Sequence, residues 1–200
     1  MKEYRVGELR IATYGDVYKP SEDSWLVMKV LDEIKPSREF CIDLGSGTGI
    51  LGSYSILKKY CKRVVFVDVM DDALISTLKT IEANNQSGRG IVITSIEGVI
   101  DNKADMVVTN PPYLPVNDSS RIDIATEGGE RGYETIVYFV QEASRVLKQG
   151  GVLVLVYSTL SNEDIVYEAL MSHGFQPLRT WGSKFFYEEI KVVYSEKGEV

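Results

Sequence analysis

Four consecutive residues, Asn110-Pro111-Pro112-Tyr113, combine the groups needed to hold a planar amine. They follow the stretch 104–109, whose branched apolar residues are typical of a buried strand. Neither proline can donate a hydrogen bond to a neighbouring strand, so the chain must leave the sheet there as a stiff segment. Such a segment can fix an amide side chain, a carbonyl oxygen and an aromatic ring relative to one another. Taken alone, the four residues also fit a plain exit from a strand, with Tyr113 as cover.

The stretch Asp43-Leu44-Gly45-Ser46-Gly47-Thr48-Gly49 is a second candidate site, because a glycine-rich turn directly follows an apolar run. Glycines let the backbone approach a ligand closely, and the N–H groups at the start of the next helix would point at it. The spacing departs from the dinucleotide-binding fingerprint, since Ile50 stands where the third glycine would be. A carboxylate at Asp43 would repel a pyrophosphate and attract a cationic amino-acid group.

Asp68 is a second acid that could contact the same ligand. It ends the apolar stretch 63–67, about 20 residues beyond the glycine turn, where an acid can accept hydrogen bonds from both ribose hydroxyls. A nucleoside that carries a positively charged amino acid would satisfy Asp43 and Asp68 together, which predicts S-adenosylmethionine as the cofactor. Each acid alone also fits an ordinary strand end or helix cap.

A methyl donor at this place gives the segment from Asn110 to Tyr113 a chemical role. A planar amide or aryl amine is a poor nucleophile, because its lone pair is delocalised. The side-chain oxygen of Asn110 and the carbonyl of Pro111 could each accept one N–H bond, which would aim the nitrogen at the methyl group and stabilise its developing charge. Tyr113 could pack on the planar acceptor. Transfer would then depend mostly on positioning, without a strong general base.

Strand and helix patterns alternate along the chain and would position these groups. Residues 1–19 alternate weakly and predict short edge strands or an extended arm. Ser21, Glu22 and Asp23 fit the capping and first turn of a helix that ends before Pro36. The remaining pattern predicts right-handed βαβ units and a mostly parallel sheet with helices on both faces. Strands are expected near 40–43, 63–67, 90–94, 104–109, 152–157, 175–180 and 189–195, and helices near 21–34, 50–59, 72–84, 133–147 and 161–174.

Composition narrows the class of protein. The chain of 200 residues is long enough for one domain with a sizeable core, so we expect a single domain over residues 1–200. A net charge of -7 argues against an extended nucleic-acid surface, which normally has a basic footprint. No apolar run has the length of a membrane span, and the first residues lack a secretory pattern.

The few cysteine and histidine residues predict no metal site. Cys41 and Cys61 form neither a metal-binding spacing nor a disulfide framework, and Cys41 is expected to be an inert buried thiol. With His173 as the single histidine, neither a histidine-based triad nor a zinc site is expected. We therefore place the protein in a reducing cytoplasm.

Together these motifs resemble the class I amino-methyltransferases. The leader Val17-Tyr18-Lys19-Pro20-Ser21-Glu22-Asp23-Ser24 is similar to one branch, the HemK-like protein glutamine N5-methyltransferases of archaeal and eukaryotic type. Leu114-Pro115 and the stretch 127–132 also look like that branch, and the resemblance covers about residues 15–195. It implies a Rossmann-like fold whose seven-stranded sheet is mostly parallel with one antiparallel strand.

The resemblance also implies site residues, a substrate and a partner. The substrate would be the glutamine of the Gly-Gly-Gln loop in a class I translation release factor, and a small zinc-binding activator protein often assists relatives of this branch. Ser95 departs from the family, which usually has an acid there to accept a bond from the adenine amine. The cofactor would contact Ser24, Asp43, Gly45, Gly47, Asp68, Ser95 and Asn110, and the acceptor would be held by Asn110, Pro111, Pro112 and Tyr113.

The sequence is also compatible with two other functions. The Asn-Pro-Pro-Tyr motif is shared with DNA and RNA amino-methyltransferases, so the acceptor could be an exocyclic base amine. A different class would be a non-catalytic cofactor-binding subunit, although an intact motif argues against it. The polar loop 116–132 is long for a compact domain, which favours a wall of the substrate groove over a plain surface connection.

Overall fold

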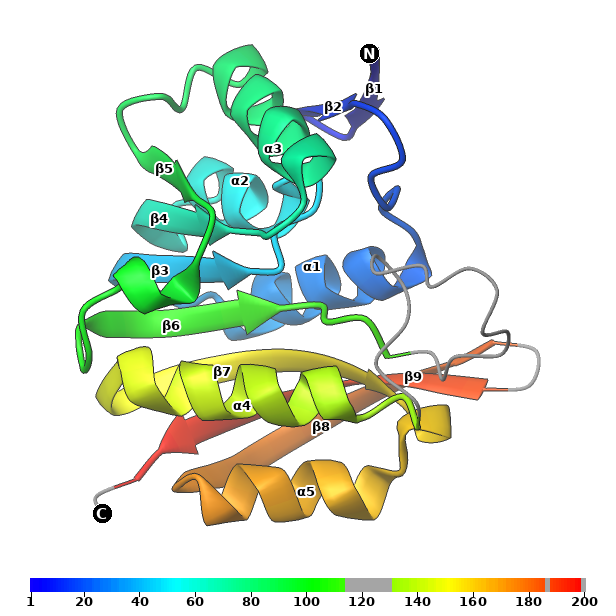
Figure 1. The fold of residues 1–200 in the computed structure, drawn as a ribbon, viewed down its shortest axis with the longest axis vertical. Helices are drawn as coiled ribbons and strands as arrows, with labels where there is room; N and C mark the ends of the chain where they lie inside the picture. Colours follow the sequence, from blue (N-terminus) through cyan, green and yellow to red (C-terminus); the bar gives the residue numbers. More distant parts are fainter. Residues whose placement is uncertain (114–130, 186–187, 199–200) are drawn as a thin grey trace.

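In the computed structural model, which describes residues 1–113, 131–185 and 188–198, a twisted sheet separates two layers of helices (Figure 1). The strands of this sheet are β3 (Arg38–Leu44), β4 (Cys61–Val67), β5 (Gly90–Ile93), β6 (Ala104–Thr109), β7 (Leu147–Ser158), β8 (Phe175–Phe185) and β9 (Glu188–Lys197). Their order is β5-β4-β3-β6-β7-β9-β8, and β9 runs antiparallel to both of its neighbours while the other paired strands are parallel. The prediction of a seven-stranded, mostly parallel sheet with one antiparallel strand is confirmed.

Helices cover both faces of the sheet, as predicted. They are α1 (Glu22–Ile34), α2 (Ile50–Leu57), α3 (Asp71–Ala83), α4 (Glu134–Val146) and α5 (Glu163–Ser172), with short 3-10 turns η1 (Ile96–Gly98) and η2 (Thr159–Ser161). Helices α1, α2 and α3 belong to the hydrophobic core on one face, and α4 and α5 belong to the core on the other. None of the helices among the described residues is both long and apolar enough to cross a membrane.

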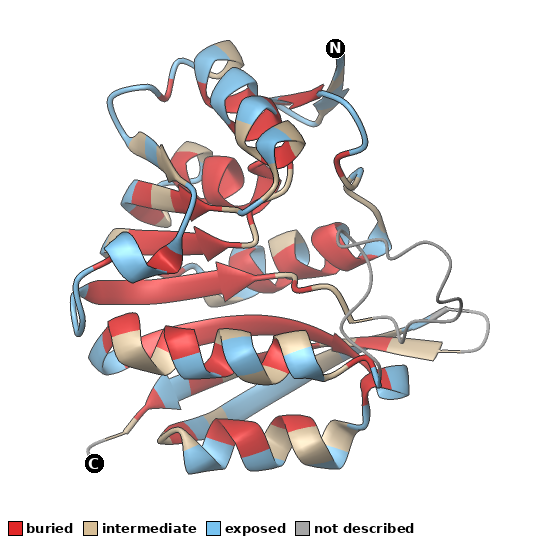
Figure 2. Cartoon of the chain, viewed as in Figure 1, coloured by how far each residue is buried: buried red, intermediate tan, exposed pale blue. Residues whose placement is uncertain are grey.

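The central strands are buried on both faces (Figure 2), which explains their nearly continuous apolar sequences. All six residues of β6 are buried. The strand ends at Thr109 because the prolines that follow cannot pair. The hydroxyl of Thr109 donates to the carbonyl oxygen of Leu44 over 2.7 Å. This bond ties the end of β6 to the end of β3.

The N-terminal strands form a separate hairpin. β1 (Lys2–Val6) and β2 (Leu9–Thr13) pair antiparallel with each other. β2 lies along α3, where the backbone N–H of Ala12 donates to Thr80 Oγ1 over 3.0 Å. Leu9 and Ile11 of β2 are fully buried in the core beside α1 and α2.

Helix α1 begins and ends where the sequence predicts, but its first turn is not a simple cap. Ser21 occupies the N-cap position with an extended backbone, yet its hydroxyl bonds to Glu22 instead of capping a backbone N–H. Lys35 ends the helix in the left-handed conformation, directly before Pro36. Asp23 lies in the first turn of α1, as predicted, but it is buried, with only 2% of its surface exposed.

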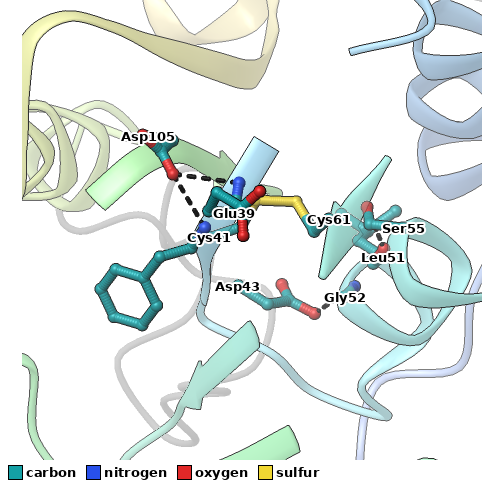
Figure 3. The surroundings of a disulfide bond; sticks show 9 residues. Glu39, Cys41, Asp43, Leu51, Gly52, Ser55, Cys61 and Asp105 are labelled. Carbon is teal, nitrogen blue, oxygen red and sulfur yellow. Dashed lines mark hydrogen bonds between the residues drawn. A yellow bond between two sulfur atoms is a disulfide. The ribbon is translucent and has the colours of Figure 1, made fainter. Parts of the chain in front are cut away.

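A disulfide between Cys41 and Cys61 corrects the prediction of two unpaired thiols (Figure 3). Cys41 lies in β3 and Cys61 begins β4, and these two strands are neighbours in the sheet. Their Cα atoms are 6.1 Å apart, a separation that a disulfide spans readily. The spacing of the two residues along the sequence could not reveal this pairing, because the strand order brings them together.

Candidate active site

Three strands end side by side at the edge of the sheet where the predicted residues lie. Leu44, at the end of β3, is in register with Val67 of β4 and with Thr109 of β6. The residues that follow these strand ends are therefore neighbours. They open onto a cavity of about 300 Å³, a size typical of small-molecule sites. Its lining includes the predicted residues Ser24, Gly45, Gly47, Asp68, Ser95, Asn110 and Pro112.

The glycine turn forms the floor of this cavity. Gly45 and Gly47 have φ angles of +71° and +53°, which side chains disfavour. A Cβ atom on Gly45 would lie 2.9 Å from Cε2 of Phe139, so a side chain there would also crowd α4. Thr77 of α3 holds the turn from behind, because its hydroxyl donates to the carbonyl oxygen of Gly47 over 3.0 Å. The backbone is thus fixed at the cavity surface.

Asp68 lies between the glycine turn and the cavity. Its Oδ2 accepts the N–H of Gly47 over 2.8 Å, and its Oδ1 accepts the N–H of Met70 over 3.0 Å. Each carboxylate oxygen has a further lone pair, so Asp68 can still accept hydroxyl groups from a ligand. Apolar side chains line the cavity beyond it, among them Val69, Met70, Ala73, Ile96 and Phe139.

Asp43 occupies a different position from the one expected of a direct ligand. It is 1% exposed, and it is absent from the described residues that line the cavity. Its Oδ2 accepts the N–H of Gly52 over 2.8 Å, so the side chain caps the first turn of α2 (Figure 3). Burial, together with the charge of Asp68, raises the pKa of Asp43 to about 8 in spite of this bond. Asp43 therefore supports the glycine turn from within the core.

Ser95 lies at the exposed rim of the cavity. It caps the turn η1, where its Oγ accepts the N–H of Glu97 over 3.2 Å. The hydroxyl keeps its proton and one lone pair for other partners. Arg145 of α4 holds this loop in place by donating to the carbonyl oxygens of Ile96 and Val99, over 2.8 and 2.9 Å respectively.

The leader before α1 reaches the end of β6 through Asp23. Oδ2 of Asp23 accepts the hydroxyl of Tyr18 over 2.9 Å, the Nδ2 of Asn110 over 2.9 Å and the hydroxyl of Tyr113 over 3.4 Å. Burial, reinforced by the charge of Asp23, raises the pKa of both tyrosines. Both hydroxyls therefore stay protonated and can donate. Four residues from two distant segments form one hydrogen-bonded group.

Asn110 has one atom without a partner in this group. Its Oδ1 is buried and accepts no hydrogen bond from the described residues, and Oγ1 of Thr48 in the same cavity is also unpaired. Unpaired buried polar atoms are costly, so they often mark the place of a ligand. The site therefore presents an acceptor at Asn110 and a potential donor at Thr48.

The rest of the Asn-Pro-Pro-Tyr segment is anchored to the protein. Pro111 is buried and Pro112 lines the cavity. The carbonyl oxygen of Tyr113 accepts the hydroxyl of Ser161 over 2.9 Å. The Tyr113 ring is half-buried and packs against both hydrophobic cores. The predicted stacking of this ring on the acceptor stays a prediction.

Two contributors to the site escaped the sequence analysis. Asp23 was interpreted as a capping residue, although it lies four and seven residues before the apolar Val27 and Val30. That spacing places it on the buried face of α1, and it could have indicated a buried acid. Thr77 carries no such signal, because threonine in a helix is usually unremarkable. The motif Leu114-Pro115, the stretch 127–130 and most of the loop predicted as a groove wall lie outside the described residues.

Comparison with known proteins places this site in a family context. The sequence model of the family described as methyltransferase small domain matches residues 19–188. A Methanocaldococcus jannaschii protein, assigned by name as a protein N5-glutamine methyltransferase, is 31% identical over 92% of this chain and 94% of its own length. The eRF1 methyltransferase catalytic subunit mtq2 of Schizosaccharomyces pombe is 25% identical over 84% of both chains.

A solved structure also matches this chain over most of its length. It is the E. cuniculi Mtq2–Trm112 complex, which is responsible for methylation of the eRF1 translation termination factor. The matching chain is 25% identical, with a TM-score of 0.67, over 92% of this chain and 100% of that one. The similarity therefore extends over the fold.

Proposed function

The chain belongs to the methyltransferase small domain family, and we propose that it methylates the side-chain amide nitrogen of a glutamine, with S-adenosylmethionine as methyl donor. The glutamine is the one in the Gly-Gly-Gln loop of a class I translation release factor. The names of the relatives support this substrate. The structural observation that carries the proposal is the unpaired amide oxygen of Asn110 beside a cavity suited to the donor.

The cavity fits the proposed cofactor in its chemistry. Asp68 has lone pairs for the ribose hydroxyls, and the apolar wall around Ile96 can pack against a planar adenine. The glycine turn allows close backbone contact, and Ser24 and Ser95 are also among the residues that line the cavity. When bound, S-adenosylmethionine supplies a methyl group activated by the sulfonium charge. Asp43 acts behind the turn, where it fixes the backbone that contacts the cofactor.

Asn110 and Pro111 position the acceptor amide. The free Oδ1 of Asn110 accepts one N–H of the glutamine side chain, and the carbonyl of Pro111 accepts the other. The amide is thereby held in one orientation, and the positive charge that grows on its nitrogen is stabilised by two oxygen dipoles. The nitrogen that gains the methyl group loses one of its protons to water, and most of the rate enhancement comes from orientation, so the site needs no strongly basic residue. Tyr113 contributes its ring as one side of the acceptor pocket.

We propose that a small partner protein assists this chain. The similar solved structure is a complex of two proteins, and the S. pombe relative is described as a catalytic subunit. We expect the partner to be of the zinc-binding kind. A release factor as substrate would also place the reaction in the cytoplasm.

Transfer of labelled methyl groups tests the proposal. The chain is incubated with radiolabelled S-adenosylmethionine and a class I release factor, with and without a small zinc-binding partner, and the product is mapped by peptide mass spectrometry. We expect one methyl group on the glutamine of the Gly-Gly-Gln loop. No label on the release factor under either condition would refute the proposed substrate. Isothermal titration with S-adenosylmethionine in the same preparation separates this result from a failure to bind the cofactor.

A further inference from the structure

Asp23 of α1 contacts the acceptor side of the site without lining the cavity. We infer that Asp23 is a positioning residue, which fixes the side-chain amide of Asn110 with its oxygen toward the acceptor and its nitrogen away from it. The inference rests on the proposed function, because it assigns the orientation that an acceptor N–H2 group requires.

The hydrogen bonds of Asp23 support this role. Its Oδ2 is 2.9 Å from Nδ2 of Asn110, and the two residues lie 87 positions apart in the sequence. Asp23 is 2% exposed, so water does not compete for this bond. A carboxylate can only accept hydrogen bonds, whereas an amide side chain presents an acceptor on one side and a donor on the other. The amide nitrogen of Asn110 must therefore face Asp23.

The other end of the amide then has one possible orientation. With Nδ2 bound to Asp23, Oδ1 of Asn110 points away from the carboxylate, and it is the atom left unpaired in the structure. If the amide were turned over, its N–H2 group would face the N–H2 group of the glutamine. Two donors would then meet, and neither the glutamine orientation nor the growing charge on its nitrogen would be stabilised.

Several donors hold the Asp23 carboxylate in turn. The hydroxyls of Tyr18 and Tyr113 point at Oδ2, over 2.9 and 3.4 Å. The backbone N–H of Ser24 donates to Oδ1 over 2.6 Å, and the Ser24 hydroxyl donates to the same atom over 3.2 Å. Both carboxylate oxygens are thus occupied, and the side chain cannot rotate without breaking bonds at each end. Because Ser24 also lines the cofactor cavity, the two halves of the site share this residue pair.

Substitution Asp23→Asn tests the inference with a change of a few atoms. The new side chain can keep its oxygen toward Ser24, but it then presents an N–H2 group to Asn110. We expect Asn110 to turn over in response. The kcat for glutamine methylation should fall by about 100-fold, while the KM for the release factor and the Kd for S-adenosylmethionine change little.

Asp32→Asn is the matched control in the same helix. Asp32 also accepts two tyrosine hydroxyls through one oxygen, from Tyr54 at 2.7 Å and Tyr60 at 2.8 Å, and it lies outside the cavity lining. Asp32 is exposed, so the control matches the hydrogen bonds of Asp23 and not its burial. A general effect of removing a tyrosine-bound carboxylate from α1 would lower kcat in both variants. Unchanged kcat in Asp32→Asn, with the expected loss in Asp23→Asn, supports the inference.

An NMR measurement tests the same point without the acceptor. The side-chain N–H2 signals of Asn110 are identified by their absence in Asn110→Ala. We expect these signals to shift strongly in Asp23→Asn and to stay in place in Asp32→Asn. If Asp23→Asn does not fold, slow exchange of the Asn110 N–H2 protons with water in the unaltered chain serves as the test.

Unshifted or rapidly exchanging Asn110 signals would overturn the inference, as would unaltered kcat in Asp23→Asn. Neither result would affect the proposed function if the unaltered chain methylates the release factor. Conversely, the NMR result stands even if the acceptor proves to be a different amine.

Discussion

The proposed cofactor side and the proposed acceptor side of the site are held together by different kinds of contact. On the cofactor side, Asp68 spends its bonds on the backbone N–H groups of Gly47 and Met70, which lie within 21 positions of it. On the acceptor side, Asp23 accepts hydrogen bonds from its near neighbours Tyr18 and Ser24 and also from the side chains of Asn110 and Tyr113, 87 and 90 positions away. Among the described residues, the acid on one side binds only backbone N–H groups, and the acid on the other also joins side chains of distant segments.

Because of this difference, we expect one side to hold the cofactor and the other to orient the acceptor. A turn fixed by local backbone bonds and glycine φ angles can form a rigid cradle for a cofactor that is the same in every reaction cycle. A cluster of side chains from several elements can orient one chemical group, the amide of Asn110, toward a separate substrate. We therefore expect substitutions on the cofactor side to change binding, and substitutions on the acceptor side to change the rate of transfer.

Asn110→Ala should have the largest effect on methyl transfer, and it should separate the transfer rate from cofactor binding most clearly. It removes the oxygen that accepts from the glutamine amide, so methyl transfer should fall by about 1,000-fold or more. The affinity for S-adenosylmethionine, measured by isothermal titration, should stay within about threefold, because Asp68 and the glycine turn are intact. Full turnover by this variant would show that the acceptor side is not where we place it.

Loss of the Cys41–Cys61 disulfide, which joins the neighbouring strands β3 and β4, should lower the stability of the whole fold. Closing a chain segment of this length stabilises a folded protein by about 3 kcal/mol, so Cys61→Ala should lower the free energy of unfolding in urea by a similar amount. Alkylation of the denatured protein provides the direct check. Two thiols that react without a reductant would contradict the pairing, whereas none should react if the bond is formed.

Asp68→Ala should act on binding rather than on transfer. The variant loses the acceptor for ribose hydroxyls and also the bond that holds Gly47, so the Kd for S-adenosylmethionine should rise by about 100-fold. At saturating cofactor, kcat should recover most of its value. Asp71→Ala, at an exposed position in the first turn of α3, is the matched control and should bind normally. Equal affinities in the two variants would remove Asp68 from the cofactor site.

Asp43 should make the stability of the folded chain depend on pH. Its pKa is about 8 in the folded protein and near the ordinary value of 3.8 in the unfolded chain, so the folded state binds the proton more tightly. Its contribution to stability is complete below pH 3.8 and is lost as the pH rises toward 8. Relative to Asp43→Asn, the unaltered chain should lose at most about 1.4 kcal/mol per pH unit in this range. A constant difference between the two urea curves from pH 5 to pH 8 would show an ionised Asp43.

The same contrast explains which features could be predicted from sequence. The glycine turn, Asp68 and the strand ends depend on neighbouring residues, and the alternation of strands and helices determines that these ends meet at one edge. The seven-stranded, mostly parallel sheet and the place of Asn110 at the end of a strand follow from such local patterns and from the family resemblance. The structure brings Ser24, Gly45, Gly47, Ser95 and Pro112 to the same cavity.

The features that sequence analysis missed depend on contacts between distant segments. Asp23 has the local signature of a helix cap, and only the fold places it beside Asn110. The disulfide requires β3 and β4 to be neighbours, which the spacing of the cysteines does not reveal. Asp43 has the sequence position of a ligand-binding acid. In the fold its carboxyl group binds the N–H of Gly52 in the first turn of α2, and the residue is not among the described residues that line the cavity.

One competition experiment tests the central claim most directly. The chain, together with the proposed small partner protein, is given labelled S-adenosylmethionine and equal concentrations of a class I release factor and an RNA that carries exposed adenines and cytosines. We predict that the label appears on the glutamine of the Gly-Gly-Gln loop, as located by peptide mass mapping, and that it disappears when this glutamine is replaced by alanine. Label on the RNA alone would contradict the account and assign Asn110 to a base amine instead.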